Sequence, residues 1–266
     1  VIDPLEAKKD DVLDGGLRVI RRLGSGATAT ALLVREVNGA GDDGGDAGRE
    51  LVLKVARDEQ YADRLAAEAQ TLAKLKGEWL VASIVREPIM VGSRTALLME
   101  SAGPRTLAEE LHKGRLALDL LERYGSDLLE IVALLDSRGI WHRDIKPANL
   151  AARPRARDRE MHLCIFDFSL ANTPATQLGA GTVPYLDPFL GPPKRPRYDA
   201  AAERFAAAVT LYEMATGTLP RWGDNANPAA IEDEVTLDPS LFDQSVADRL
   251  VAFFAKALAR DVSNRF

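Results

Sequence analysis

The sequence predicts an α+β fold, in which a small antiparallel sheet with one helix is followed by a larger and mainly helical part. The N-terminal residues, up to Ala102, form short apolar runs separated by glycine-containing turns, which is typical of strands. After Gly103, apolar residues recur instead at helical spacing. With 266 residues, of which 46% are hydrophobic, the chain can bury the core that two such parts need. We therefore expect domains over residues 1–102 and 103–266.

The strands of the first part are expected where aliphatic and β-branched residues cluster. Leu17–Leu23 ends in a glycine turn, and Ala29–Val37 follows as its hairpin partner. Further strands are expected over Leu51–Ala56, about Val81–Val91, and Arg94–Glu100.

One helix is expected within the first part, over Asp58–Lys76. Leu65, Ala69 and Leu72 follow helical spacing there, and Gly77 stands where a helix would stop. Residues 38–48 hold five glycines and three aspartates, so we expect a solvated loop between two of the strands.

The second part is predicted to be mainly helical. Aliphatic residues lie on two faces of the segment that ends before Gly139, which is the pattern of a buried helix. The expected helices are Leu107–Lys113, Leu118–Arg138, Ala200–Thr216 and Ser245–Arg260. A strand is expected over His162–Phe166, with the basic insertion Arg153–Arg159 between it and a preceding short strand.

Composition excludes several classes of protein. A net charge of −6 argues against a general nucleic-acid binder. No apolar run reaches the roughly 20 residues that cross a bilayer, so we expect no membrane partner. A single cysteine, Cys164 in an apolar run, cannot form a disulfide framework and suits a reducing, cytoplasmic location. Because the chain starts at Val1 and stops at Phe266 after a helical pattern, we expect a piece of a longer protein, cut before a last helix.

The turn Leu23-Gly24-Ser25-Gly26 links the first two expected strands. Glycines allow backbone N–H groups to approach phosphate oxygens without a Cβ in the way. Glycine pairs are also ordinary in hairpins, so this motif alone decides nothing. No βαβ unit follows, which disfavours a dinucleotide-binding fold.

Lys54 lies inside the apolar strand Leu51–Ala56. A buried ammonium is costly unless it is paired, and Glu68 on the next helix can supply the carboxylate. The alternative is an edge strand whose lysine reaches solvent.

The segment Trp141–Leu150 (WHRDIKPANL) carries the most specific signal. It places Asp144, Lys146 and Asn149 in one loop between a helix and a strand. There an aspartate can accept a hydroxyl proton, a lysine can neutralise phosphate, and an asparagine oxygen can bind Mg²⁺. Asp167 follows an apolar strand and is a second metal-ligand candidate, although a strand-end turn would also explain it.

Taken together and in this order, these segments resemble the eukaryotic-like (Hanks-type) protein kinases over about Leu17 to Arg265. The resemblance implies the bilobal protein-kinase fold, with an N-lobe over 1–102, a C-lobe over 103–266, and Mg–ATP bound between them. ATP and Mg²⁺ are the implied cofactors, with Mn²⁺ as an alternative metal.

The resemblance also assigns roles. Asp144 becomes the catalytic base, Lys146 the γ-phosphate contact, and Lys54 the α/β-phosphate contact held by Glu68. Asn149 and Asp167 become the metal ligands. The implied nucleotide contacts also include the gatekeeper Met99 and the hinge residues, and are Leu23, Gly24, Ser25, Gly26, Ala31, Val52, Lys54, Met99, Glu100, Ala102 and Ala151.

The implied activity is transfer of the γ-phosphoryl group to protein serine or threonine hydroxyls, because a lysine two residues after Asp144 is the serine/threonine form. Gly181–Tyr185 resembles the substrate-positioning segment, and the Thr182 hydroxyl is expected to contact Asp144 and Lys146. More narrowly, WHRDIKP, FDFSLA and YLDPFL resemble the kinase domain of bacterial phage-growth-limitation (bacteriophage-exclusion) defence kinases. The implied partners are protein substrates and other domains of a longer chain.

Regulation is implied by Arg143, which in this family commonly receives a phosphorylated residue of the activation loop. Thr173 and Thr176 are the candidate sites, and the kinase's own activation loop is therefore an expected substrate. Both threonines are equally compatible with ordinary polar loop positions.

Several positions depart from the family pattern. Ser169 replaces the glycine after the metal-binding Asp-Phe pair, and Glu203 replaces a helix aspartate that braces the catalytic loop. Phe189 replaces a glutamate that pairs with an arginine, here Arg265, which then needs another partner or stays solvated. These changes motivate a rival reading as a pseudokinase that binds ATP or acts as a scaffold.

The valine and alanine that sandwich adenine in the family are exchanged here, as Ala31 and Val52. A small-molecule kinase of related fold is disfavoured, because Gly181–Pro188 keeps the peptide-positioning segment. No core polar residue of the catalytic set is missing, so we expect an active enzyme.

Overall fold

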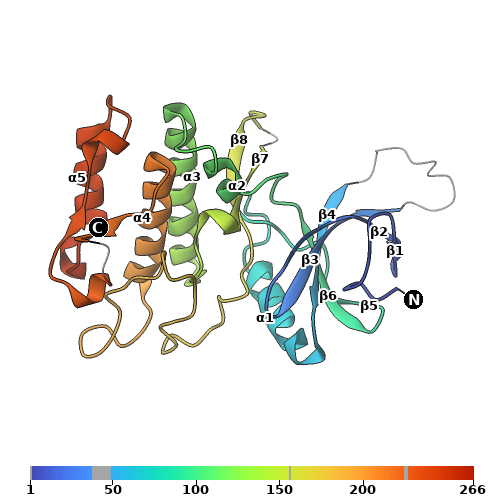
Figure 1. Ribbon diagram of the computed structural model, residues 1–266. Coiled ribbons are helices and arrows are strands. Elements are labelled where there is room, and N and C mark those ends of the chain that lie inside the picture. Colours follow the sequence, from blue (N-terminus) through green and yellow to red (C-terminus); the bar gives the residue numbers. More distant parts are fainter. Residues whose placement is uncertain (1, 38–48, 156, 225–226) are drawn as a thin grey trace. The chain divides into compact units, whose positions relative to one another are not determined.

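The computed structural model describes residues 2–37, 49–155, 157–224 and 227–266 (Figure 1). The predicted α+β class is confirmed, because an antiparallel sheet forms in the N-terminal region and helices dominate the C-terminal one. The chain forms two compact units, Val1–Ala102 and Gly103–Phe266. The loop expected over residues 38–48 lies outside the described residues.

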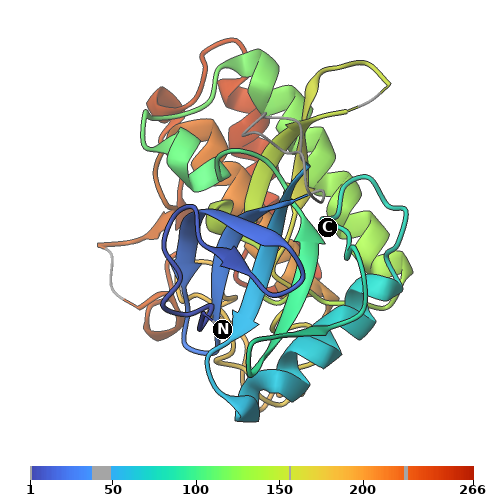
Figure 2. The ribbon, with the colours of Figure 1, turned by 90° about the vertical axis from the view of Figure 1, so that its right-hand side faces the viewer.

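The first unit holds a six-stranded antiparallel sheet in the order β1-β2-β3-β4-β6-β5 (Figure 2). The strands are β1 (Val12–Leu13), β2 (Leu17–Ser25), β3 (Ala29–Glu36), β4 (Glu50–Ala56), β5 (Ile89–Val91) and β6 (Arg94–Glu100). Helix α1 (Ala62–Ala73) packs against β6 and follows a 3₁₀ turn, Glu59–Tyr61, whose N-cap is Asp58.

The expected strand over residues 81–91 is wrong for most of its length. Only Ile89–Val91 is a strand, while Ile84 forms an isolated bridge to Met99. Residues 83–85 still follow β6 through two backbone hydrogen bonds, from Val85 to Leu98 and from Glu100 to Ser83. Pro88 has no backbone N–H to donate, which explains why the regular ladder does not continue through it.

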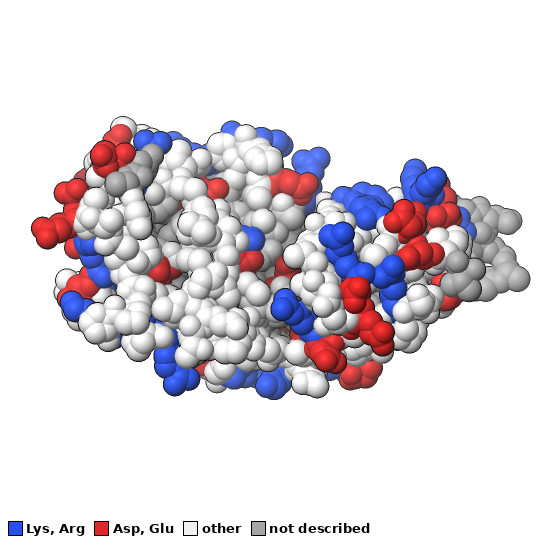
Figure 3. Space-filling model, turned by 60° about the horizontal axis from the view of Figure 1, so that its bottom comes forward, with Lys and Arg blue, Asp and Glu red and all other residues white. Residues whose placement is uncertain are grey.

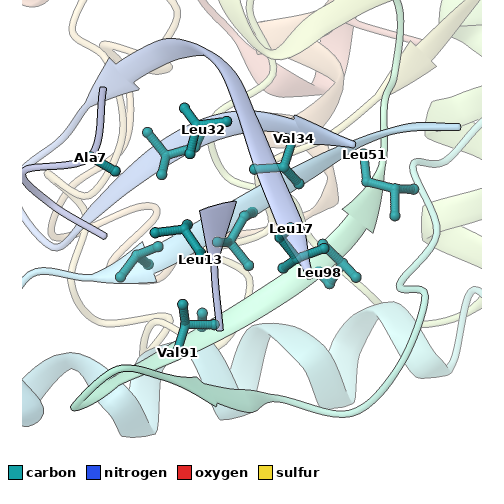
Figure 4. Close-up of a cluster of buried hydrophobic side chains, with 12 residues drawn as sticks. Ala7, Leu13, Leu17, Leu32, Val34, Leu51, Val91 and Leu98 are labelled. Carbon is teal, nitrogen blue, oxygen red and sulfur yellow. The ribbon is translucent and has the colours of Figure 1, made fainter. Parts of the chain in front are cut away.

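An N-terminal segment that the sequence analysis left unassigned covers one face of this sheet. Its Ala7 and Leu13 join the apolar cluster formed by Leu17, Leu32 and other strand residues (Figure 4). Hydrogen bonds hold it in place: Arg94 donates to both carboxylate oxygens of Asp3 at 2.8 and 2.9 Å.

The second unit is built around helices. These are α2 (Leu107–Leu111), α3 (Leu118–Ser137), α4 (Ala200–Thr216) and α5 (Ala247–Ala257). Two hairpins accompany them, β7 (Leu150–Pro154) with β8 (Met161–Ile165), and β9 (Arg221–Trp222) with β10 (Val235–Thr236). Short 3₁₀ turns lie at Pro147–Asn149, Pro228–Ala230, Pro239–Leu241 and Val262–Asn264.

Helix α4 is the centre of this unit, because both α3 and α5 pack against it. It begins at its N-cap Asp199, whose side chain accepts from the Ala202 amide, and it ends at Gly217 in the left-handed conformation. Its apolar residues lie on all sides, as expected for a buried helix. On this helix, Tyr212 packs edge-on against Phe242 and Phe254.

Charged side chains of both signs are interspersed over the face of the first unit shown in Figure 3. Among the helices of the described residues, none is both long and apolar enough to cross a membrane.

The N-terminal segment offers a direct test of its packing. Leu13 is 3% exposed and Val12, beside it on β1, is 47% exposed. We expect Leu13→Ala to lower the free energy of unfolding by about 2–3 kcal/mol, because it removes buried methyl groups and leaves a cavity. Val12→Ala serves as the matched control and should change it by less than about 0.5 kcal/mol. Urea denaturation of both variants measures the difference, and equal values would show that the segment does not contribute to the core.

Candidate active site

The polar centre of the first unit is an ion pair between β4 and α1. The Lys54 ammonium lies 2.8 and 2.7 Å from the two carboxylate oxygens of Glu68. The Glu68 side chain is 1% exposed and that of Lys54 14%. The pairing expected from the sequence is therefore present, and the alternative of a solvent-directed edge lysine is excluded.

Strand register places several expected nucleotide contacts on the same sheet face as Lys54. Ala31 is the direct partner of Lys54, and Val52 is the partner of Met99. Lys54 and Val52 are two residues apart, so their side chains point the same way. The opposite face carries the apolar cluster of the N-terminal segment. Ala31 and Val52, which are exchanged relative to the family pattern, thus lie on neighbouring strands and on the same face of the sheet.

The glycine turn between β2 and β3 is closed by a hydrogen bond from the Gly26 amide to the Ala29 carbonyl, 2.9 Å. A Cβ added at Gly24 would meet nothing within 4 Å, and one at Gly26 only the Ala29 carbonyl oxygen at 3.6 Å. Neither residue has a positive φ. Backbone strain and packing therefore explain neither glycine, whereas close approach of a ligand would.

The residues assigned to the hinge, Glu100 and Ala102, lie at the C-terminal end of the first unit. The Glu100 amide is engaged with the Ser83 carbonyl at 2.8 Å, and its side chain pairs with Arg49. Met99 and Ala102 are buried. Leu23 and Ser25 lie at the exposed end of β2, and the Ser25 hydroxyl contacts that of Thr30 at 3.1 Å.

The polar centre of the second unit is the carboxylate of Asp144. Lys146 donates to Oδ2 at 2.7 Å, and the Thr182 hydroxyl donates to Oδ1 at 2.7 Å. The Lys146 ammonium also donates to the Thr182 hydroxyl, at 2.6 Å. The contacts expected for Thr182 are therefore present, and they link the catalytic-loop candidates to the segment 181–190.

Asn149 completes this group. Its side-chain NH₂ donates to the Asp144 carbonyl at 2.9 Å and to the Asp144 carboxylate at 3.0 Å. Both amide hydrogens thus have acceptors on one residue, which leaves the side-chain oxygen as the group that can bind a cation.

Asp167 is brought to the same region by the β7–β8 hairpin. The Phe166 amide donates to the Asn149 carbonyl at 3.1 Å, so Asp167 directly follows the residue that is hydrogen-bonded to Asn149. Asp167 adopts φ 65°, a left-handed conformation that is costly for a residue other than glycine. Ser169 has no positive φ, so this conformation does not require glycine there. Ala151, the expected nucleotide contact on β7, is buried and pairs with Cys164 of β8.

The described residues contain no group of three or more His, Cys, Asp or Glu side chains that could hold a metal. Mg²⁺ commonly uses only one or two protein ligands and completes its shell with phosphate and water. Asn149 and Asp167 therefore fit a metal that arrives with a nucleotide.

Glu203 of α4 holds the catalytic loop in place. Its carboxylate accepts the backbone amides of His142 and Arg143 at 2.5 and 3.1 Å, and the Tyr198 hydroxyl at 2.5 Å. Burial raises the pKa of Tyr198, and the neighbouring Glu203 charge raises it further, so the hydroxyl stays a proton donor. Sequence analysis found Glu203 but missed Tyr198, which lies five residues before it and gives no motif signal.

Arg143 lies against the segment that holds Thr173 and Thr176. Its side chain is buried, and it donates to the backbone carbonyls of Thr173, Pro174 and Gln177 at 2.6, 2.9 and 2.6 Å. Its guanidinium lies 4.4 Å from the centre of the Tyr198 ring. Burial lowers the pKa of this guanidinium, an effect that Tyr198 and Glu203 oppose. Arg143 thus binds this segment through its backbone carbonyls.

Comparison with known proteins finds a matching family model and several relatives. The model of the protein kinase domain matches residues 17–266. The chain is 41% identical to the "Probable kinase PglW" of Streptomyces coelicolor, over 99% of this chain and 18% of that protein. It is 29% identical to serine/threonine-protein kinase pkn2 of Myxococcus xanthus (79% of this chain, 25% of that protein) and 29% identical to PknF of Mycobacterium tuberculosis (94% and 53%). The chain therefore spans about half or less of these relatives.

The bracing role of Glu203 predicts a specific loss of stability. In Glu203→Gln an amide NH₂ replaces one carboxylate oxygen and faces buried donors, so we expect the free energy of unfolding to fall by about 2–3 kcal/mol. Tyr198→Phe, which removes one donor, should cost about 1 kcal/mol. Glu122→Gln, at an exposed position of α3, is the control. Chemical denaturation measures all three, and a Glu203→Gln protein as stable as the control would contradict the assignment.

Proposed function

Because the chain belongs to the protein kinase family, we propose that it transfers the γ-phosphoryl group of Mg–ATP to serine and threonine hydroxyls of protein substrates. The observation that supports this most is the group formed by Asp144, Lys146, Asn149 and Thr182. In this group the Asp144 carboxylate accepts a hydrogen bond from the Thr182 hydroxyl at 2.7 Å, and it also accepts one from the Lys146 ammonium. A substrate hydroxyl needs the same three features: an acceptor for its proton, a cation for the phosphoryl oxygens, and a fixed position.

The roles divide between the two units. Asp144 accepts the proton of the substrate hydroxyl, and Lys146 neutralises charge on the transferred group. Lys54, oriented by Glu68, binds the α- and β-phosphates. Asn149 and Asp167 would hold the metal, which when bound neutralises the phosphate oxygens.

The adenine contacts are proposed on the Lys54 face of the sheet and at the chain segment that leaves it. Ala31, Val52 and Met99 would meet the ring, and the backbone of Glu100 and Ala102 would bind its polar edge. Gly24 and Gly26 would lie over the phosphates. The exchange of alanine and valine leads us to expect adenine nearer Val52 than in a typical kinase.

The wider setting rests on similarity. The motifs that resemble phage-growth-limitation kinases, together with the 41% identity to PglW, support a role in bacterial phage defence as the kinase part of a longer cytoplasmic protein. Its partners would be protein substrates and other domains of that protein.

Replacing the catalytic base tests the activity. We expect Asp144→Asn to slow transfer of labelled γ-phosphate to a basic protein substrate by at least about 100-fold, because the amide cannot accept the hydroxyl proton. Asp119→Asn, on the exposed start of α3, should keep the wild-type rate.

Nucleotide binding is measured beside transfer in both variants. If the wild type binds ATP but transfers no phosphate, the chain acts as a pseudokinase. If Asp144→Asn keeps full activity, Asp144 is not the base. In the parent bacterium, loss of phage resistance with Asp144→Asn would support the defence role, and unchanged resistance would contradict it.

We also propose that the activation loop is one of the kinase's own substrates, with Thr176 exposed and Thr173 half-buried. Arg143 binds the carbonyls of this loop, and alanine variants retain those carbonyls. We therefore expect Thr173→Ala/Thr176→Ala to lose label on the loop yet transfer phosphate to other substrates within about twofold of the wild-type rate. Phosphopeptide mapping and initial rates check this; a tenfold loss of rate would show instead that phosphorylation regulates the enzyme.

A further inference from the structure

Asp187 lies in the segment after Thr182, and its side chain is fully buried. Arg265 donates to its two carboxylate oxygens at 2.7 and 3.3 Å, and Arg195 donates to the same carboxylate. The Phe189 amide adds a further hydrogen bond of 3.0 Å. One carboxylate thus joins two arginines that are 70 residues apart in the sequence.

The surrounding charges balance. Arg195 also pairs with Asp199, the N-cap of α4, at 2.6 Å. Burial alone would lower the pKa of Arg195, but hydrogen bonds to Asp199 and Asp187 raise it above its ordinary value. Two carboxylates and two guanidinium groups therefore form a closed network, as buried charges require.

Arg265 connects Asp187 to the helices. Its Nε donates to the Ala259 carbonyl at 2.7 Å, just after α5, and its guanidinium carbon lies 4.8 Å from the centre of the Phe205 ring on α4. Asp187 is held, through Arg265, against two helices.

A short and rigid stretch connects Asp187 to the catalytic group. The amides of Tyr185 and Leu186 both donate to the Thr182 carbonyl, at 2.9 and 3.1 Å, which makes a tight turn. Gly181, just before this turn, packs closely against the catalytic loop. A Cβ at Gly181 would lie 2.7 Å from the Arg143 carbonyl oxygen and 2.8 Å from Leu186.

We propose that Asp187 is a positioning residue of the kinase reaction: through Arg265 and Arg195 it fixes the segment 181–187, and with it the Thr182 hydroxyl and the surface that receives the substrate peptide. This proposal rests on the proposed function. Val183, at the crest of the turn, is 81% exposed and lies where a peptide would contact the segment.

Asp187 also accounts for the missing glutamate at position 189. The carboxylate that pairs with Arg265 stands two positions earlier in this chain. Phe189 instead presents its ring to Arg265 and Arg260, whose guanidinium carbons lie 5.7 and 4.8 Å from the ring centre. A glutamate at 189 would therefore reach Arg265.

This geometry supplies the experiment, in which the carboxylate is removed and then returned at position 189. Asp187→Ala should raise the KM for a serine-containing basic peptide about tenfold or more, because the peptide surface loses its fixed position. The KM for ATP should stay within about twofold. The double variant Asp187→Ala/Phe189→Glu should recover most of the peptide affinity. Asp248→Ala, at an exposed position of α5, is the control.

Hydrogen exchange of residues 181–190 gives a readout that does not depend on activity. Exchange should be faster in Asp187→Ala and return toward the wild-type rate in the double variant. Asp187→Asn, which keeps the shape but removes the charge, replaces Asp187→Ala if that variant does not fold.

Unchanged peptide KM in the single variants overturns the proposal, as does an equal rise in both KM values without recovery in the double variant. An inactive wild type would contradict the proposed function instead. In that case the exchange rates alone decide whether Asp187 positions the segment.

Discussion

The second unit depends most on one buried carboxylate, that of Glu203. It accepts two consecutive backbone amides of the catalytic loop and the Tyr198 hydroxyl. Those contacts hold Arg143 at φ 70°, which directs its guanidinium toward the activation loop while Asp144 faces Lys146 and Thr182. Without this acceptor, the two buried backbone N–H groups would lack hydrogen-bond partners. Nothing would then offset the cost of the strained backbone at Arg143.

The same constraint recurs at other buried carboxylates. Glu68 orients Lys54, Asp127 accepts His162 and the Leu163 amide, and Asp187 joins two arginines. A buried charge is stable only when it is paired and hydrogen-bonded, so each of these residues ties together segments that are distant in sequence. Two of these interactions take part in the proposed chemistry: the ion pair of Glu68 with Lys54, and the contacts of Asp187 that hold the segment 181–187.

The polar core of the site could be predicted because its residues lie close together in sequence or in strand register. The contacts of Thr182 and the pairing of Lys54 with Glu68 were expected and are present. The sequence was insufficient where the structure depends on contacts that a local residue pattern does not reveal. Apolar composition suggested a strand over residues 81–91, but Pro88 interrupts the ladder. Backbone carbonyls carry no sequence signal, so the contacts of Arg143 with Thr173 and Gln177 could not be predicted.

The sequence by itself determined the α+β class and the helices α3 and α4 to within a residue, and it pointed to the residues proposed as the catalytic group, because periodicity and short motifs record local geometry. Only the tertiary structure decided which distant groups meet. In it the N-terminal segment packs on the sheet, and Arg265 pairs with the carboxylate of Asp187 in place of a glutamate at position 189. A buried cation accepts any carboxylate that the fold brings within reach, so its partner is set by packing and not by position along the chain.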